Sequence, residues 1–180
     1  MNKLLLHSCC APCGASVIEK LKPDFSLTVL FYNPNIEPFA EYTKRKDEQI
    51  KLLKKLNINY LEIDYLNDEF KNKVKGFEKE KEGGKRCELC YKLRLEKTAK
   101  LAKINNFDYF TTTLTVSPYK NSKIINEIGK SLEAKYQIKY LISDFKKEDG
   151  YKKSIELSKR YNLYRQNYCG CLYGKGLDEK

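Results

Sequence analysis

The sequence predicts an α/β fold, a doubly wound and mainly parallel sheet of about five strands with flanking helices. Short apolar runs alternate along the chain with longer segments in which apolar residues recur at helical spacing. Strands that alternate with helices pair in parallel through right-handed crossovers. Unusual sequences follow three of the predicted strands, and a doubly wound sheet binds its ligand at the carboxyl ends of its strands. We therefore expect a functional site at that edge of the sheet.

The predicted strands are apolar runs that end at polar, Pro or Gly residues. They cover residues 4–8, 27–32, 60–63, 109–114 and 138–142. The predicted helices cover residues 15–21, 37–56, 68–81, 88–104, 122–136 and 151–161. A chain of 180 residues with 41% hydrophobic content can bury one core and is short for two. We expect a single domain, 1–180, with a charged excursion at 66–86 and a C-terminal helix and Cys-Gly-Cys tail, 149–180, that packs on the site.

The N-terminus and the cysteine count together limit the class of protein. Only three leucines precede His7, too few for a secretory signal, and no later apolar stretch approaches membrane-spanning length. We therefore expect a cytoplasmic protein with no membrane partner. Seven cysteines in a reducing compartment do not form a disulfide framework, so their clustering indicates metal binding or redox catalysis.

Four of the cysteines have the pattern of a metal site. Cys87 and Cys90 are three residues apart at the start of a predicted helix, which places both sulfurs on one face and favours thiolates. Cys9 and Cys10 follow the first strand and complete a set of four that a 4Fe-4S cluster and a structural zinc both accept. Adjacent cysteines are uncommon in zinc knuckles, so the pattern favours iron-sulfur over zinc.

The remaining cysteines favour redox chemistry. Residues 10–13 read Cys-Ala-Pro-Cys between a strand and a helix, which is also the arrangement of a thioredoxin-type dithiol. Such a protein has no use for the other cysteines. Cys169 and Cys171 would close a very small, strained disulfide that is easily reduced, which suits an electron relay. We expect His7 to orient the neighbouring loop rather than to bind metal.

Basic and aromatic residues near the cysteines point to a nucleic acid. The net charge of +11 would attract a polyanion, although it also serves solubility. Of only five arginines, Arg86, Arg94 and Arg165 lie within four residues of a cysteine. Arginine binds phosphate bidentately, stacks on bases or neutralises the charge of a cluster. Tyr164 and Tyr168 are candidates for stacking on exposed nucleotides. These five residues are the predicted RNA contacts.

Four segments, taken in order, resemble a known family. They are residues 5–13 (LLHSCCAPC), 32–36 (YNPNI), 86–91 (RCELCY) and 164–171 (YRQNYCGC). No single segment is specific, but the pattern of all four is, and it looks like that of the epoxyqueuosine reductases of the QueH type over nearly the whole chain. The sheet and first loop also resemble the ATP-pyrophosphatase/HUP nucleotide-binding superfamily, with cysteines in place of its phosphate loop.

The resemblance implies an activity. Family members reduce epoxyqueuosine to queuosine at the wobble position of tRNA, the last step of queuosine biosynthesis, without cobalamin. The implied partners are the anticodon stem-loop of a tRNA carrying epoxyqueuosine and an electron donor of unidentified kind. The alternatives are a zinc-stabilised RNA-binding module, in which the cysteines are structural, and a thioredoxin-like thiol oxidoreductase.

The resemblance also implies roles for the cysteines. Cys9, Cys10, Cys87 and Cys90 would hold the 4Fe-4S cluster. The implied catalytic residues are Cys13, beside the cluster, and the redox-active pair Cys169 and Cys171. Cys13 would also bind an additional mononuclear iron, for which a carboxylate ligand is sought among Glu37, Glu41, Asp47 and Asp64.

Overall fold

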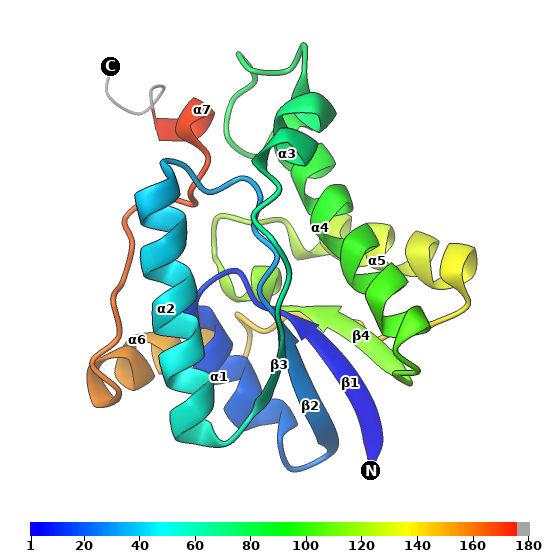
Figure 1. Cartoon of the computed structure of the whole chain (residues 1–180), viewed down its shortest axis with the longest axis vertical. Coiled ribbons are helices and arrows are strands. Elements are labelled where there is room, and N and C mark those ends of the chain that lie inside the picture. The colour runs from blue at the N-terminus through cyan, green and yellow to red at the C-terminus, as the bar shows by residue number, and fades with distance from the viewer. Residues whose placement is uncertain (176–180) are drawn as a thin grey trace.

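The structure, a computed structural model, describes residues 1–175 (Figure 1). Its centre is a five-stranded sheet in the order β3-β2-β1-β4-β5, and every neighbouring pair is parallel. The strands are β1 (Asn2–His7), β2 (Phe25–Leu30), β3 (Asn59–Leu61), β4 (Tyr109–Thr112) and β5 (Lys139–Tyr140). The prediction of a parallel, doubly wound sheet of about five strands is confirmed.

Helices cover both faces of the sheet. They are α1 (Ala11–Leu21), α2 (Phe39–Leu56), α3 (Asn67–Val74), α4 (Lys85–Ile104), α5 (Ser122–Tyr136), α6 (Gly150–Arg160) and the short α7 (Leu172–Lys175), with a 3-10 turn, η1 (Thr113–Val116), after β4. In Figure 1, α1, α2 and α6 lie on one side of the sheet, and α4 and α5 lie on the other. Helix α6 packs on α1 rather than on the sheet itself.

The central strand shows why the chain folds this way. Leu4, Leu5 and Leu6 of β1 are fully buried. Because successive side chains of a strand point to opposite faces, Leu4 and Leu6 join the core under α1 and α2, whereas Leu5 joins the core under α4 and α5. A strand that buries both faces reads as a continuous apolar run, which is the pattern that the sequence shows here.

The structure ends some predicted elements early. Helix α3 ends at Val74, not at residue 81, because Gly76 adopts φ +89°, which a helix does not allow. Residues 75–84 are therefore a loop. The strand predicted at 109–114 ends at Thr112, where the Thr112 side chain accepts a hydrogen bond from the Leu114 amide and starts η1. Both changes lie beside the cysteines.

The tail returns to the carboxyl edge of the sheet. After α6, the chain runs back along α2 and reaches α7 near the start of α2 (Figure 1). The Glu37 amide, just before α2, donates a 2.9 Å hydrogen bond to the carbonyl of Gly170. The tail predicted at 149–180 lies outside the described residues from position 176 onward. Within residues 1–175, no helix has both the length and the apolarity to cross a bilayer.

Candidate cysteine-lined active site

Three loops meet where the sheet order reverses around β1. The Cys9 amide, after β1, donates to Thr113 Oγ1, after β4, over 3.0 Å. The Asn33 side chain, after β2, donates to the Ser8 carbonyl over 2.9 Å. The neighbours of β1 are β2 and β4, so the chain connections leave a crevice at this edge, as doubly wound sheets do. The sequence prediction that these loops converge is confirmed.

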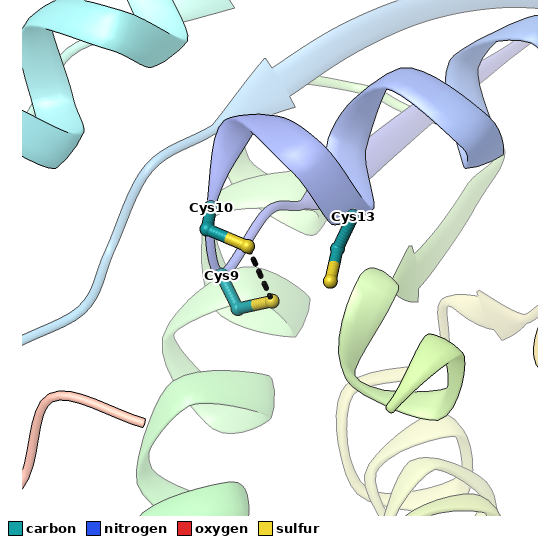
Figure 2. A group of neighbouring side chains, drawn as sticks. All are labelled: Cys9, Cys10 and Cys13. Atoms are coloured by element: carbon teal, nitrogen blue, oxygen red, sulfur yellow. Dashed lines mark hydrogen bonds between the residues drawn. The ribbon is translucent and has the colours of Figure 1, made fainter. Parts of the chain in front are cut away.

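Three cysteines form a compact sulfur group at this point. The Sγ atoms of Cys9, Cys10 and Cys13 all lie within 4.8 Å of one another. Figure 2 shows the three side chains projecting into the same space, from the loop after β1 and from the first turn of α1. Cys10 is the N-cap of α1, and Pro12 in the first turn has no amide hydrogen to leave unpaired. The helix N-terminus therefore favours negative charge on these sulfurs.

The groups around Cys9 stabilise its thiolate. Hydrogen bonds from the thiols of Cys10 and Cys13 hold the pKa of Cys9 well below its usual range, against the effect of burial. The Lys120 cation and the Thr113 hydroxyl, which donates to Cys9 Sγ over 3.2 Å, act in the same direction. The first sulfur of the loop is thus prepared to bind a metal ion without first losing a proton.

His7 supports the loop from inside the protein. Its ring is fully buried and contacts Thr112 Oγ1 at 2.9 Å and the carbonyl of Tyr32 at 3.0 Å. Burial, followed by the nearby Arg94 cation, lowers the pKa of His7 to about 4, so the ring is neutral at pH 7. Both ring nitrogens are engaged with protein atoms. This placement agrees with an orienting role for His7.

All seven cysteines line two adjoining pockets. The larger, with a volume of about 540 Å³, contains Cys9, Cys10 and Cys13. The smaller contains Cys87 and Cys90. The residues shared by both pockets are Glu82, Arg94, Lys120, Cys169 and Cys171. The tail cysteines therefore lie between the sulfur group of the first loop and the pair on α4.

The pair on α4 stands at a second helix N-terminus. Cys87 is in the first turn of α4 and accepts a 3.2 Å hydrogen bond from the Gly83 amide. Cys90 is buried one turn further on, and burial raises its pKa to about 11 even though Arg94 opposes the shift. Both sulfurs face the pocket that holds the tail. The loop at 75–84, part of the predicted charged excursion, closes over this side.

Arg94 is a buried cation between the two groups of cysteines. Only 4% of the residue is exposed. Burial disfavours its charge, but the sulfurs of Cys90 and Cys9 outweigh burial and raise its pKa. Its Nη1 donates to Asn33 over 3.3 Å, and its Nε is buried with no hydrogen-bond partner in residues 1–175. A buried donor without a partner is costly, so this position fits an acceptor or anion that occupies the pocket.

The tail is fixed by a second buried arginine, Arg45 of α2. Its Nη1 and Nη2 donate to the carbonyls of Cys169 and Tyr168, both over 3.1 Å. Its Nε donates to Glu41 over 2.7 Å, and Arg45 is only 2% exposed. The Tyr164 hydroxyl also donates to Glu41, over 3.1 Å. We call these five residues the tail clamp.

The structure places the predicted RNA contacts in different settings. Arg86 is buried and donates to the carbonyls of Glu78 and Glu80, so it holds the 75–84 loop. Arg94 is buried among the cysteines. Arg165 is exposed and lines the large pocket, and Tyr168 also lines it. The hydroxyl of Tyr164 is occupied by the tail clamp.

Sequence reasoning missed several pocket residues. Glu82 is the one carboxylate lining the large pocket among the described residues, whereas the sequence directed attention to Glu37, Glu41, Asp47 and Asp64. Tyr119 and Lys120, in the loop after η1, line the same pocket. Glu82 stands among glycines and lysines on a loop that reads as a solvated charged segment. Its position follows only from the fold of residues 75–84.

The donor set fits an iron-sulfur centre. Seven thiols and a buried guanidinium with an unpartnered Nε surround the pockets. Iron-sulfur clusters are bound by thiolates, and nearby hydrogen-bond donors and cations stabilise their negative charge. The close spacing of Cys9, Cys10 and Cys13 suits a shared single ion, and ligands of a four-iron cluster lie further apart because each binds a different iron. The spacing found here therefore matches a single ion directly, and a cluster bound through both Cys9 and Cys10 requires their sulfurs, 3.8 Å apart, to turn away from each other.

Comparisons with solved structures support the fold. The chain is similar to the U34-tRNA thiolase NcsA from Methanococcus maripaludis with its [4Fe-4S] cluster, with a TM-score of 0.59 and 16% identity, covering 96% of this chain and 61% of that one. It is also similar to a predicted subunit of tRNA methyltransferase from Methanocaldococcus jannaschii, with a TM-score of 0.53 and 16% identity, covering 88% and 74%. These likenesses support the α/β fold described above.

Comparisons with sequences identify the family. Residues 4–176 match the family model described as epoxyqueuosine reductase QueH. Relatives named epoxyqueuosine reductase QueH include those of Streptococcus pyogenes, 43% identical over 97% of this chain and 72% of the relative, and of Thermotoga maritima, 38% identical over 96% and 90%. The relative from Haemophilus influenzae is 43% identical over 96% and 71%. The resemblance expected from the four sequence segments is confirmed, and the chain belongs to the epoxyqueuosine reductase QueH family of oxidoreductases.

Proposed function

We propose that this protein reduces epoxyqueuosine to queuosine at the wobble position of tRNA, using a 4Fe-4S cluster, an adjacent iron and a redox-active cysteine pair. One observation carries the proposal beyond family membership. All seven cysteines, from three distant segments of the chain, line two adjoining pockets at the carboxyl edge of the sheet. The gathering of cysteines from position 9 to position 171 supports a single site that uses all of them.

The proposed cluster ligands lie at the N-termini of two helices, α1 and α4. Cys9 and Cys10 before α1, with Cys87 and Cys90 in α4, would hold the cluster, and Cys13 would hold the second iron at the floor of the large pocket. When bound, the cluster would supply single electrons and the iron a Lewis acid for the epoxide oxygen. Glu82, the one carboxylate that lines this pocket among the described residues, is the candidate carboxylate ligand of the second iron.

The tail cysteines match the electron count of the reaction. Removing the epoxide oxygen as water consumes two electrons and two protons. Oxidation of the thiols of Cys169 and Cys171 to one disulfide releases two electrons and two protons, so one tail oxidation balances one turnover. Arg45 binds the carbonyls of Tyr168 and Cys169, and both tail cysteines line the two pockets. An external donor must then reduce the disulfide before the next turnover.

The test separates the roles of the cysteines by metal analysis and activity. The protein is purified without oxygen, its iron, sulfide, zinc and visible spectrum are measured, and its product on epoxyqueuosine-containing tRNA is analysed as nucleosides. Cys87→Ser and Cys90→Ser are expected to lose iron and sulfide together. Cys13→Ser is expected to keep sulfide, lose part of the iron and lose activity.

The tail pair gives the matched comparison. Cys169→Ser and Cys171→Ser are expected to keep the metal content of the unchanged protein but to stop catalysis after the electrons already stored are used. One zinc per chain without sulfide in the unchanged protein would contradict the proposal and favour the zinc-stabilised RNA-binding module. Full iron and activity in Cys13→Ser would remove the second iron from the proposal.

A further inference from the structure

We propose that the outer rim of the large pocket is a nucleotide-binding surface on which Tyr119 and Tyr151 stack on bases that flank the modified nucleotide, while Lys120 and Arg165 bind phosphates. The inference rests on the proposed function for its partner, the anticodon loop of a tRNA. All four residues line the same pocket as Cys9, Cys10 and Cys13.

The two tyrosines of the rim are exposed, and the Arg165 guanidinium lies 6.0 Å from the centroid of the Tyr151 ring. Tyr119 is 81% exposed, and in the described part of the chain its ring has no aromatic or cationic partner. Tyr151 is 37% exposed at the start of α6, on a different segment of the rim. Aromatic side chains stack on unpaired bases without regard to sequence. Two such rings at one pocket mouth therefore suit the bases on either side of a nucleotide that enters the pocket.

The cations of the rim have no carboxylate partners. Arg165 Nη1 donates to the Ser154 carbonyl over 3.3 Å and to Ser158 Oγ over 3.0 Å, which fixes the guanidinium on α6 without neutralising it. Among residues 1–175, neither Lys120 nor Arg165 forms an ion pair. A fixed, uncompensated arginine is a usual contact for a phosphate.

The interior of the pocket points to a base as its occupant. Its volume of about 540 Å³ lies within the range of roughly 300–1,000 Å³ found for small-molecule sites. Gln166 lines this pocket, and its Oε1 is buried with no hydrogen-bond partner in the described residues. Guanine-type bases carry N–H donors on the edge that pairs in a duplex, and an anticodon base leaves that edge free. An unpartnered acceptor next to the sulfur group therefore matches a base turned out of the loop and into the pocket.

The proposed rim contacts also agree with the position of the cysteines. A nucleotide that turns into the pocket brings the modified group of its base toward the cysteines, while the neighbouring bases remain at the mouth with Tyr119 and Tyr151. The phosphates that join these nucleotides then pass the rim, where Lys120 and Arg165 lie. Buried Arg94 and Arg86 take no part in this surface because each is less than 5% exposed.

The test measures binding of an unmodified anticodon stem-loop RNA, so it needs neither the epoxide nor turnover. The RNA carries a fluorescent label, and anisotropy gives its affinity for the anaerobically purified full chain. Tyr119→Ala and Tyr151→Ala are each expected to weaken binding about 5- to 100-fold, as loss of one stacked base does. The matched control is Tyr60→Ala, a tyrosine that is 40% exposed on β3 and lines a different pocket.

A charge variant tests the phosphate contacts. Lys120→Ala is expected to weaken binding and to lower the slope of log affinity against log salt by about one. Its control is Lys54→Ala, an exposed lysine in the last turn of α2. Circular dichroism and iron content must match the unchanged protein in every variant. These measurements show that a loss of binding is not a loss of folding.

The outcomes separate this inference from the proposed function. If the unchanged protein binds the RNA and reduces epoxyqueuosine, but the rim variants bind as well as Tyr60→Ala and Lys54→Ala, then the rim is not the binding surface and the reductase function stands. If the unchanged protein does not bind the RNA at all, both the rim and the tRNA partner are wrong.

Discussion

Arg45 and Cys169 are 124 positions apart in the sequence and are joined directly, because Arg45 Nη1 donates a 3.1 Å hydrogen bond to the Cys169 carbonyl. The same guanidinium reaches the Tyr168 carbonyl and Glu41, and it lies over the Tyr168 ring at 4.9 Å. One buried side chain thus fixes the backbone immediately before the Cys-Gly-Cys segment. The position of Cys169 and Cys171, the proposed redox pair, therefore depends on a side chain of α2 and not only on the Cys-Gly-Cys segment itself.

Replacing Arg45 with alanine is expected to release the tail. The change removes three hydrogen bonds and leaves the partly buried Glu41 without its cation, at a cost of about 2–4 kcal/mol to this local contact. Cys169 should then react faster with an alkylating reagent, followed by mass spectrometry. Activity should fall by up to about 100-fold because the thiols lose their position.

Two further variants make this result specific. Arg45→Lys should restore little, because an ammonium group cannot span two carbonyls and a carboxylate as a planar guanidinium does. Lys46→Ala is the control, since Lys46 is the next residue on α2 and pairs with exposed Glu62 instead. Equal alkylation of Cys169 in Arg45→Ala and Lys46→Ala would show that Arg45 does not hold the tail.

Gly170→Ala is expected to displace the same segment by a different route. Gly170 has φ +115°, a conformation that side chains rarely adopt, and an added Cβ would lie 2.7 Å from Ile36 Cγ1. The strain of about 1–3 kcal/mol should open the Glu37 amide to Gly170 carbonyl hydrogen bond. Hydrogen exchange of the Glu37 amide should therefore become faster.

The control for this prediction is Gly174→Ala, four residues along the same tail. An added Cβ at Gly174 meets its nearest atom, Arg86 Nη2, only at 3.9 Å. Exchange at Glu37 should be unchanged in this variant. If Gly170→Ala exchanges as slowly as Gly174→Ala, the close approach of residue 170 to Ile36 is not what sets the path of the tail.

Much of the fold was predictable from the sequence because it depends on local patterns. The apolar run Leu4 to Leu6 and the similar runs after it mark strands buried on both faces, and the helices between them leave parallel pairing as the simple solution. The residues that follow each strand then had to meet at one edge. The unusual segments that follow three of the predicted strands do meet there, and the Cys9 amide donates to Thr113 Oγ1 at that edge.

The tail clamp was not predictable, for a physical reason. Arg45 lies among many charged residues of α2, with Glu41 four positions earlier, which is the pattern of an exposed ion pair on a helix surface. Only the return of the tail buries this pair. Similarly, proximity to cysteines in the sequence indicated Arg94 as a functional residue but gave no sign of its burial. Long-range packing decides both cases.

Arg94 is expected to set the reduction potential of the proposed cluster. Its charge lies beside Cys90 and Cys9, and a positive charge stabilises the more negative, reduced form of a cluster. Arg94→Met should therefore lower the potential by about 60 mV or more, which is a tenfold change for one electron. A redox titration followed by visible spectroscopy measures the shift, with iron and sulfide determined on the same sample.

Arg94→Lys separates the effect of charge from that of packing. The reduction potential of the lysine variant should stay close to that of the unchanged protein because lysine keeps the positive charge, although it loses the hydrogen bond to Asn33. A potential that is unchanged in Arg94→Met with full iron content would show that Arg94 serves only the structure. A shift of the reduction potential that is equal in Arg94→Met and Arg94→Lys would also show that the charge of Arg94 does not set the potential.

The contact between α4 and α5 is expected to weaken in acid. Glu96 accepts hydrogen bonds from Lys135 Nζ at 2.7 Å and from the Tyr136 hydroxyl at 2.6 Å. Burial raises the pKa of Glu96, but these two hydrogen bonds outweigh it and lower the pKa from 4.5 to about 2. The stabilisation is therefore complete above pH 4.5 and is lost as the pH falls toward 2. Because Lys135 is largely exposed, we expect about 1–2 kcal/mol.

Urea unfolding of the unchanged protein and Glu96→Gln at pH 7 and pH 3 measures this contribution. Glu96→Gln should lower the free energy of unfolding at pH 7 by that amount, and the difference should shrink at pH 3, where the unfolded carboxyl is already protonated. Any loss of metal in acid is common to both proteins and cancels in the difference. Glu127→Gln, an exposed position on α5, is the control. If the difference between Glu96→Gln and the unchanged protein stays constant from pH 7 to pH 3, ionised Glu96 does not stabilise the α4–α5 contact.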